Sequence, residues 1–160
     1  MNVVVIAIGQ SLRGDDAVGL EAVRLWSESY PATAARPDVR VEFGGLPGLG
    51  LLDLLGGAGA ALIVDAVRSN STAGTIHRLN PDELSAFDSG AQSAHGFGVA
   101  ETLALASQLE LPIQHVSIRI IGIEAGQMDL GAALSPAVSA ILPSAAAAIE
   151  TELQTLLANP

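Results

Sequence analysis

Apolar runs recur along the chain and are separated by longer amphipathic segments. Runs of β-branched and aliphatic residues are typical of strands buried on both faces of a parallel sheet. They predict strands at 3–8, 60–67 and 116–123, with a shorter one at 39–43. Residues 75–79 instead alternate between apolar and polar side chains, which indicates a strand at the edge of the sheet.

The segments between the strands have the apolar spacing of helices. The first helix is predicted to open at Asp15 or Asp16 and to run to about Tyr30, because apolar residues recur there at helical spacing and Pro31 follows. Shorter helical segments are predicted at 51–55, 81–87 and 96–109.

The carboxyl-terminal segment predicts a long, alanine-rich helix. Ser135 and Pro136 mark its start, because serine is a favoured N-cap and proline a favoured first helical residue. Pro143 should kink it. Strands alternating with helices imply an α/β fold of three layers, in which a twisted, mainly parallel sheet of about five strands lies between helices on both faces. Sites in such folds lie at the carboxyl ends of the strands.

Length and composition support one domain over residues 1–160. A chain of 160 residues is long enough for one core and short for two. The formal net charge of −10 argues against nucleic acid or a membrane surface as a partner and favours a cation. The absence of cysteine excludes disulfides and thiolate chemistry. The first apolar run ends at Gly9 with no basic residue before it, which fits neither a signal peptide nor a membrane span.

The loop after the first predicted strand, residues 9–16, carries two adjacent aspartates where this architecture places sites. One aspartate suffices to cap a helix, because a single carboxylate accepts the free amides and faces the positive end of the helix dipole. For Asp15, helix capping and a role in a functional site are equal alternatives. Asp16 is the stronger candidate for a role in the functional site.

Asp65 is a lone carboxylate near the end of a buried run, and such a group needs a partner, hydrogen bonds or a metal. If the first and third strands are neighbours, Asp65 and Asp16 emerge at the same edge and favour a cation between them. His95 precedes a helix, where the dipole keeps an imidazole neutral, as a metal ligand must be. His77 and His115 are predicted to be ordinary surface or satisfied residues.

Asp16, Asp65 and His95 together would suit nickel, zinc, manganese or iron, with positions left open for water or substrate. Two alternatives use overlapping residues. A nucleotide site with Glu42 as the ribose-binding acid lacks GxGxxG and the P-loop ending. A serine hydrolase with Ser11, Asp65 and His95 has the chain order of an α/β-hydrolase triad, but Arg13 stands where the nucleophile elbow needs glycine.

Five stretches, in this order, closely resemble the hydrogenase maturation protease family. They are VVVIAIGQSLRGDDAVGLEAV, FGGLPGLGLLDLL, LIVDAV, SAHGFGVAETLALA and IIGIEAGQMDLGAALSPAVSAILP. The resemblance covers nearly the whole chain and is specific as a set. Gln10 departs from it, since the family usually has asparagine after the glycine.

The resemblance implies a cytoplasmic endopeptidase that removes the C-terminal extension of a nickel-iron hydrogenase large-subunit precursor after nickel insertion. The family's nickel-binding positions map onto Asp16, Asp65 and His95, which would also be the catalytic residues. The nickel would then be supplied by the substrate, and either aspartate is an alternative general base. We expect a monomer with no nucleic-acid or membrane partner, and a peptide groove lined by 46–55 and 89–93.

Overall fold

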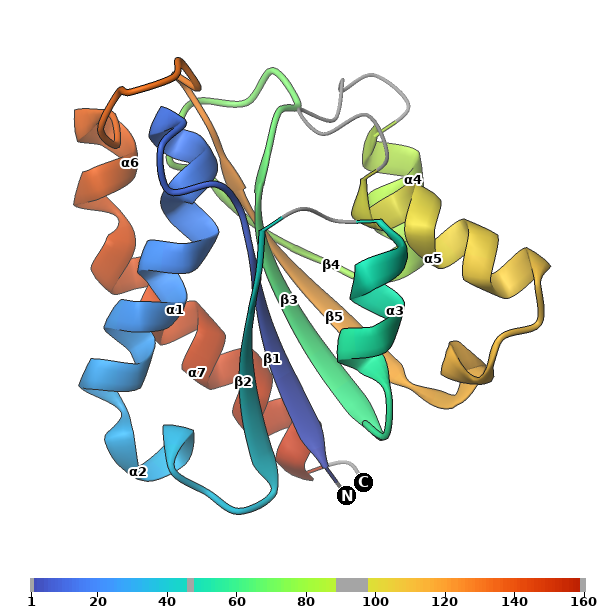
Figure 1. The fold of residues 1–160 in the computed structure, drawn as a ribbon. Coiled ribbons are helices and arrows are strands. Elements are labelled where there is room, and N and C mark those ends of the chain that lie inside the picture. Colours follow the sequence, from blue (N-terminus) through green and yellow to red (C-terminus); the bar gives the residue numbers. More distant parts are fainter. Residues whose placement is uncertain (1, 46–47, 89–97, 159–160) are drawn as a thin grey trace.

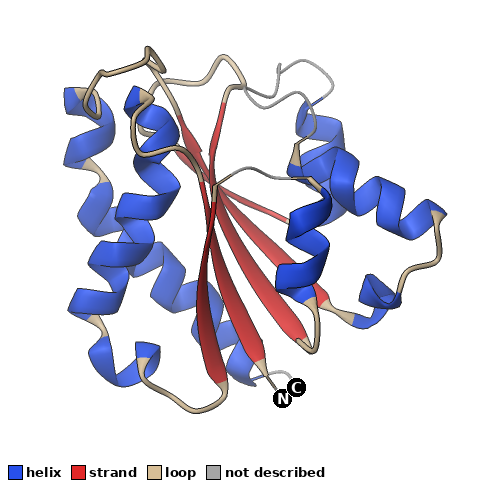
Figure 2. Ribbon diagram, viewed as in Figure 1, coloured by secondary structure: helices blue, strands red, loops and turns tan. Residues whose placement is uncertain are grey.

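Five strands form one sheet between two helical layers in the computed structural model, which describes residues 2–45, 48–88 and 98–158 (Figures 1 and 2). The strands are β1 (Val3–Ile8), β2 (Val39–Gly44), β3 (Ala60–Val67), β4 (Ile76–Leu79) and β5 (Ser117–Glu124). Their order across the sheet is β2-β1-β3-β5-β4, and β4 alone among them is antiparallel to its neighbour. The predicted three-layer α/β fold with a mainly parallel sheet is confirmed.

The helices divide between the two faces of the sheet (Figure 1). One face is covered by α1 (Val18–Ser29) and α7 (Leu142–Ala158), with α2 (Pro31–Ala34) and α6 (Pro136–Ala140) beside them. The other face is covered by α3 (Leu49–Leu55), α4 (Pro81–Asp88) and α5 (Val99–Gln108). Two short 3-10 turns complete the elements, η1 (Gly14–Ala17) and η2 (Pro112–His115).

Pro31 and Pro143 each lie in the first turn of a helix, which was not predicted. Pro31 ends α1 as predicted but also begins α2, because its fixed φ and missing N–H suit a first helical position. The long final helix is broken at Ile141 into α6 and α7, so that Pro143 lies in the first turn of α7. There its missing donor costs nothing, since first-turn amides have no intrahelical acceptor.

The strand order creates a switch point beside β1. The chain leaves β1 to form β2 on one side and later forms β3 on the other side. The loops after β1 and β3 therefore diverge at the carboxyl edge, where α/β proteins place ligands. The predicted adjacency of the first and third strands is thus confirmed.

Gly19 allows α1 to cross closely over the ends of β1 and β3. A Cβ atom at this position would lie 2.6 Å from the carbonyl oxygens of both Ile8 and Val64. Because these oxygens belong to rigid central strands, a side chain there must push the helix away. The absence of a side chain at Gly19 thus helps to bring η1, at the start of this helix, against β3.

Gly19→Ala is expected to lower the free energy of unfolding by about 2 kcal/mol, the usual cost of overpacking a rigid site. Urea denaturation followed by circular dichroism measures this change. Gly50→Ala is the matched control, because a Cβ atom at Gly50 would have no described heavy atom within 4 Å beyond its chain neighbours and its own helix backbone, and alanine favours the helix α3. Equal stability of the two variants would contradict the close approach.

Candidate functional site

Asp16 is held at the carboxyl edge of β1 by the loop that precedes it. Its side chain is buried, and its Oδ2 accepts a hydrogen bond of 3.2 Å from the main-chain N–H of Gln10. Gly9, with φ +150°, lets the loop fold back, since a Cβ there would lie 2.2 Å from the carbonyl oxygen of Asp16. The carboxylate therefore has a fixed position beside the strand end.

Asp15 has a structural role that differs from the predicted helix cap. Its fully buried carboxylate accepts hydrogen bonds from the N–H groups of Gly126, Gln127 and Ser135 and from the Ser135 hydroxyl, at 2.7–2.8 Å. The structure shows no side-chain capping bond at the N-terminus of η1 or α1. The capping alternative for Asp15 is therefore wrong, because the donors come from the loop after β5 rather than from the helix.

The hydrogen bonds also set the charge of Asp15. Burial by itself would raise the pKa of this carboxyl group, but the donors from Gln127, Ser135 and Gly126 outweigh it and hold the pKa below its ordinary value. The group is consequently a carboxylate at neutral pH, and it ties η1 to the segment between β5 and α6.

Asp65 lies on the sheet face that α3 and α5 cover, in alternation with Ile63 and Ala61. It is 8% exposed, and its Oδ1 accepts a hydrogen bond of 2.8 Å from the N–H of Ala66. Asp65 stands one residue beyond the part of β3 that pairs with β1. It therefore projects where the two strands separate, at the switch point.

Asp16 lies in η1, after β1, and Asp65 lies near the end of β3, so both are at the same edge of the sheet, where η1 contacts β3. His95, the third predicted ligand, and the predicted groove segment 89–93 lie outside the described residues. Within the described part of the chain, no group of three histidine, aspartate or glutamate side chains is arranged to hold a metal ion. A site built from the predicted trio would need His95.

The structure does not support the serine hydrolase through Ser11 or the nucleotide site through Glu42. Ser11 is exposed, and it makes no side-chain hydrogen bond to any described residue that could activate it as a nucleophile. Glu42 lies on β2, where one of its oxygens is 3.7 Å from Nε of Arg40.

Glu124 is a buried acid that the sequence reasoning missed. At the end of β5 it accepts hydrogen bonds from the N–H and hydroxyl of Ser69, and its Oε2 lies 3.2 Å from Nε2 of His77. Gly122 is paired with Asp65 on one side and His77 on the other, so these side chains share one face of the sheet. The prediction that His77 is a satisfied residue is confirmed, and His115 is exposed as expected.

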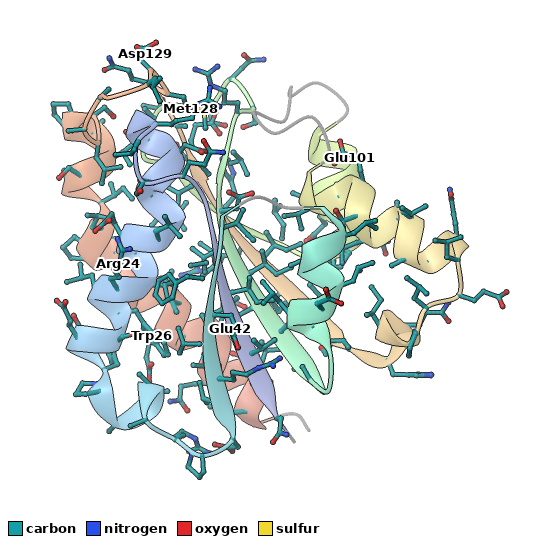
Figure 3. All side chains as sticks on the ribbon, in the orientation of Figure 1. Arg24, Trp26, Glu42, Glu101, Met128 and Asp129 are labelled. Carbon is teal, nitrogen blue, oxygen red and sulfur yellow. The ribbon has the colours of Figure 1, made fainter. Side chains whose placement is uncertain are left out.

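Glu101 in the first turn of α5 was also missed, and Figure 3 labels it. Its Oε2 is buried and has no hydrogen-bond partner among the described residues. A buried carboxylate oxygen without a donor is costly, so a hydrogen-bond donor or a cation at this position would be favourable.

Comparison with known proteins decides the family. A model of the family described as hydrogenase maturation protease matches residues 23–152. The chain is 30% identical over 154 residues to the hydrogenase expression/formation protein HupD of Rhodobacter capsulatus, covering 95% of this chain and 71% of that protein. The chain belongs to the hydrogenase maturation protease family. The resemblance seen in the sequence is confirmed.

Other members of the hydrogenase maturation protease family agree in sequence and fold. The hydrogenase 2 maturation protease of Escherichia coli K12 is 28% identical over 148 residues, covering 91% of this chain and 86% of that protein. The NiFe hydrogenase maturation protease HybD of Thermococcus kodakarensis has a solved structure with a TM-score of 0.75 and 28% identity, covering 94% and 98% of the two chains. The E. coli endopeptidase HybD, at 22% identity, shares the fold with a TM-score of 0.78, covering 97% and 93%.

The match to the family model begins after Asp16 and includes Asp65 and His95. Among the described residues, no helix is long and apolar enough to cross a bilayer.

Proposed function

We propose that this hydrogenase maturation protease is an endopeptidase that removes the C-terminal extension of a nickel-iron hydrogenase large-subunit precursor once nickel has been inserted. Asp16, Asp65 and His95 recognise the precursor's nickel. The observation that carries the proposal is the pair of buried carboxylates, Asp16 and Asp65, at the switch point of a chain of this family.

The donor set fits nickel as part of the substrate. Two carboxylates and an imidazole are ligands that Ni²⁺ accepts, and three protein ligands leave positions that the precursor's own ligands can fill. A carboxylate pair at one edge also attracts a cation. The two negative charges repel each other, and a cation between them offsets this repulsion. Nickel-loaded precursor would thus bind better than nickel-free precursor.

The same residues provide what hydrolysis of a peptide bond requires. A water oxygen attacks the carbonyl carbon, the C–N bond breaks, and a proton is delivered to the leaving amine. A fixed carboxylate at Asp16 or Asp65 can take the proton from the attacking water. The precursor's nickel, as a Lewis acid, can polarise the carbonyl that is attacked. On this proposal the chain is an aspartate- and metal-dependent peptidase.

The proposal predicts cleavage that depends on nickel. Purified enzyme is incubated with nickel-loaded and nickel-free precursor, and the mass of the large subunit is followed over time. We expect loss of the extension from the loaded precursor and at least about 100-fold slower loss from the nickel-free form, the size of effect that a missing catalytic contact produces. Equal rates for both forms would contradict nickel recognition while leaving the endopeptidase activity established.

A further inference from the structure

A cavity of about 450 Å³ lies beside the loop that holds Asp16. Its volume is within the range of pockets that bind ligands. We call it the loop cavity, and the residues that matter in it are Gln10, Leu12, Arg13, Arg24, Phe43 and Leu130. Gln10 joins the two sites, because it lines the cavity and its N–H donates to Asp16. Asp16 itself is buried and does not line the cavity, so a peptide in the loop cavity would lie against the loop that holds Asp16.

The loop cavity gathers apolar side chains that are open to solvent. Five large apolar side chains are exposed in the described part of the chain, and three of them line this cavity. Leu12 is 70% exposed, Phe43 49% and Leu130 80%. A hydrogen bond of 2.7 Å from the Gly131 N–H to the Leu12 carbonyl holds the two leucine segments together. Exposed apolar side chains that cluster around a hollow mark an interaction site.

The charge of the loop cavity is opposite to that of the protein. The chain has a net charge of −10, yet the charged residues that line the cavity are Arg13 and Arg24. Arg24 on α1, labelled in Figure 3, pairs with Glu21, and its guanidinium lies 5.6 Å from the centre of the Phe43 ring. Half-buried Arg13 makes no ion pair with any described residue. The cavity thus offers a cation in an apolar setting.

We propose that the loop cavity binds the precursor segment next to the cleaved bond, as an extended peptide with apolar side chains and a carboxylate that Arg13 receives. This proposal rests on the proposed function. It adds a second region of the precursor that the protein recognises, apart from the nickel. Leu12, Phe43 and Leu130 contact the apolar side chains, and Arg13 selects the anion. A carboxylate is attracted to this cavity although the net charge of the protein repels it.

Binding of a synthetic, nickel-free peptide that spans the cleaved bond tests the loop cavity separately from cleavage. Fluorescence anisotropy with a labelled peptide is expected to show about tenfold weaker binding for Arg13→Gln and for the double variant Leu12→Ser with Leu130→Ser. Leu109→Ser is the matched control, since Leu109 is 58% exposed and does not line the cavity. It should bind as the wild type does.

Two modified peptides identify the anion. If a peptide with a C-terminal amide binds wild type and Arg13→Gln with equal affinity, the peptide's α-carboxylate is the group that Arg13 binds. If instead a peptide with neutral residues in place of its acidic ones binds both proteins with equal affinity, a side-chain carboxylate of the peptide is the group that Arg13 binds.

Equal binding by all variants would overturn the proposal, and so would self-association of the protein that Leu130→Ser abolishes while peptide binding is unchanged. In either case normal nickel-dependent cleavage would leave the proposed function intact. Absence of cleavage with intact peptide binding would instead contradict the proposed function. Circular dichroism confirms that each variant is folded.

Discussion

Asp16→Asn and Asp65→Asn are each expected to lower kcat/KM for nickel-loaded precursor at least about 100-fold while the fold is retained. Asparagine keeps the shape and the acceptor oxygen that meets the N–H of Gln10 or of Ala66. It removes the charge that a cation requires and the basicity that accepts a proton. Rates from the mass of the large subunit, with thermal unfolding of each variant, measure both effects.

The control for these two variants is Asp82→Asn, which removes an exposed carboxylate from α4. It should cleave at the wild-type rate. Unfolding of Asp65→Asn would show that the negative charge of Asp65 serves the structure. Wild-type rates in folded Asp16→Asn and Asp65→Asn would exclude both residues from the reaction.

Asp15→Asn is expected to lower the free energy of unfolding by about 3 kcal/mol at neutral pH. The variant loses the negative charge that now accepts four hydrogen bonds, and it places a side-chain NH2 group, itself a donor, next to donors. Hydrogen bonds to a buried charge contribute about 1.5–3 kcal/mol each, and their contributions do not simply add. Urea denaturation measures the change. Asp129→Asn, in the same loop but exposed, is the matched control and should change stability by less than about 0.5 kcal/mol.

The destabilisation by Asp15→Asn should depend on pH in one direction. The pKa of Asp15 is lower in the folded protein than its ordinary value of 3.8. Its carboxylate therefore stabilises the fold above the unfolded pKa, and this stability is lost as the pH falls through the folded pKa. The gap between wild type and variant should be constant near neutrality and shrink below about pH 4. A gap that widens in acid would contradict the hydrogen-bonded carboxylate.

The strands and the position of Asp65 could be predicted from sequence because both rest on local pattern. A charge that interrupts an apolar run is visible in one dimension, and the run itself marks a buried strand. The same reasoning applied to residues 120–124 would have found Glu124, the acid that ends β5. It was missed because the predicted strand, 116–123, stops one residue short of Glu124, and its partner His77 becomes its neighbour only through the antiparallel pairing of β4.

The role of Asp15 could not be predicted because its partners are more than 110 residues away along the chain. Two adjacent aspartates before a helix look alike in sequence. In the fold, Asp15 serves the loop after β5, and Asp16 lies beside the end of β1. The loop cavity is equally invisible in the sequence, since β2, α1 and the segment around Leu130 meet there only in three dimensions.

The X-ray absorption spectrum of the precursor's nickel tests the proposed role of Asp16 and Asp65 most directly. Nickel-loaded precursor is frozen with and without enzyme before cleavage proceeds, and the nickel edge and its nearest neighbours are compared. With wild-type enzyme the nickel should gain oxygen or nitrogen neighbours, and with Asp16→Asn or Asp65→Asn it should gain fewer. A nickel spectrum that wild-type enzyme leaves unchanged, although the two proteins are bound, would contradict direct recognition of the metal by these carboxylates.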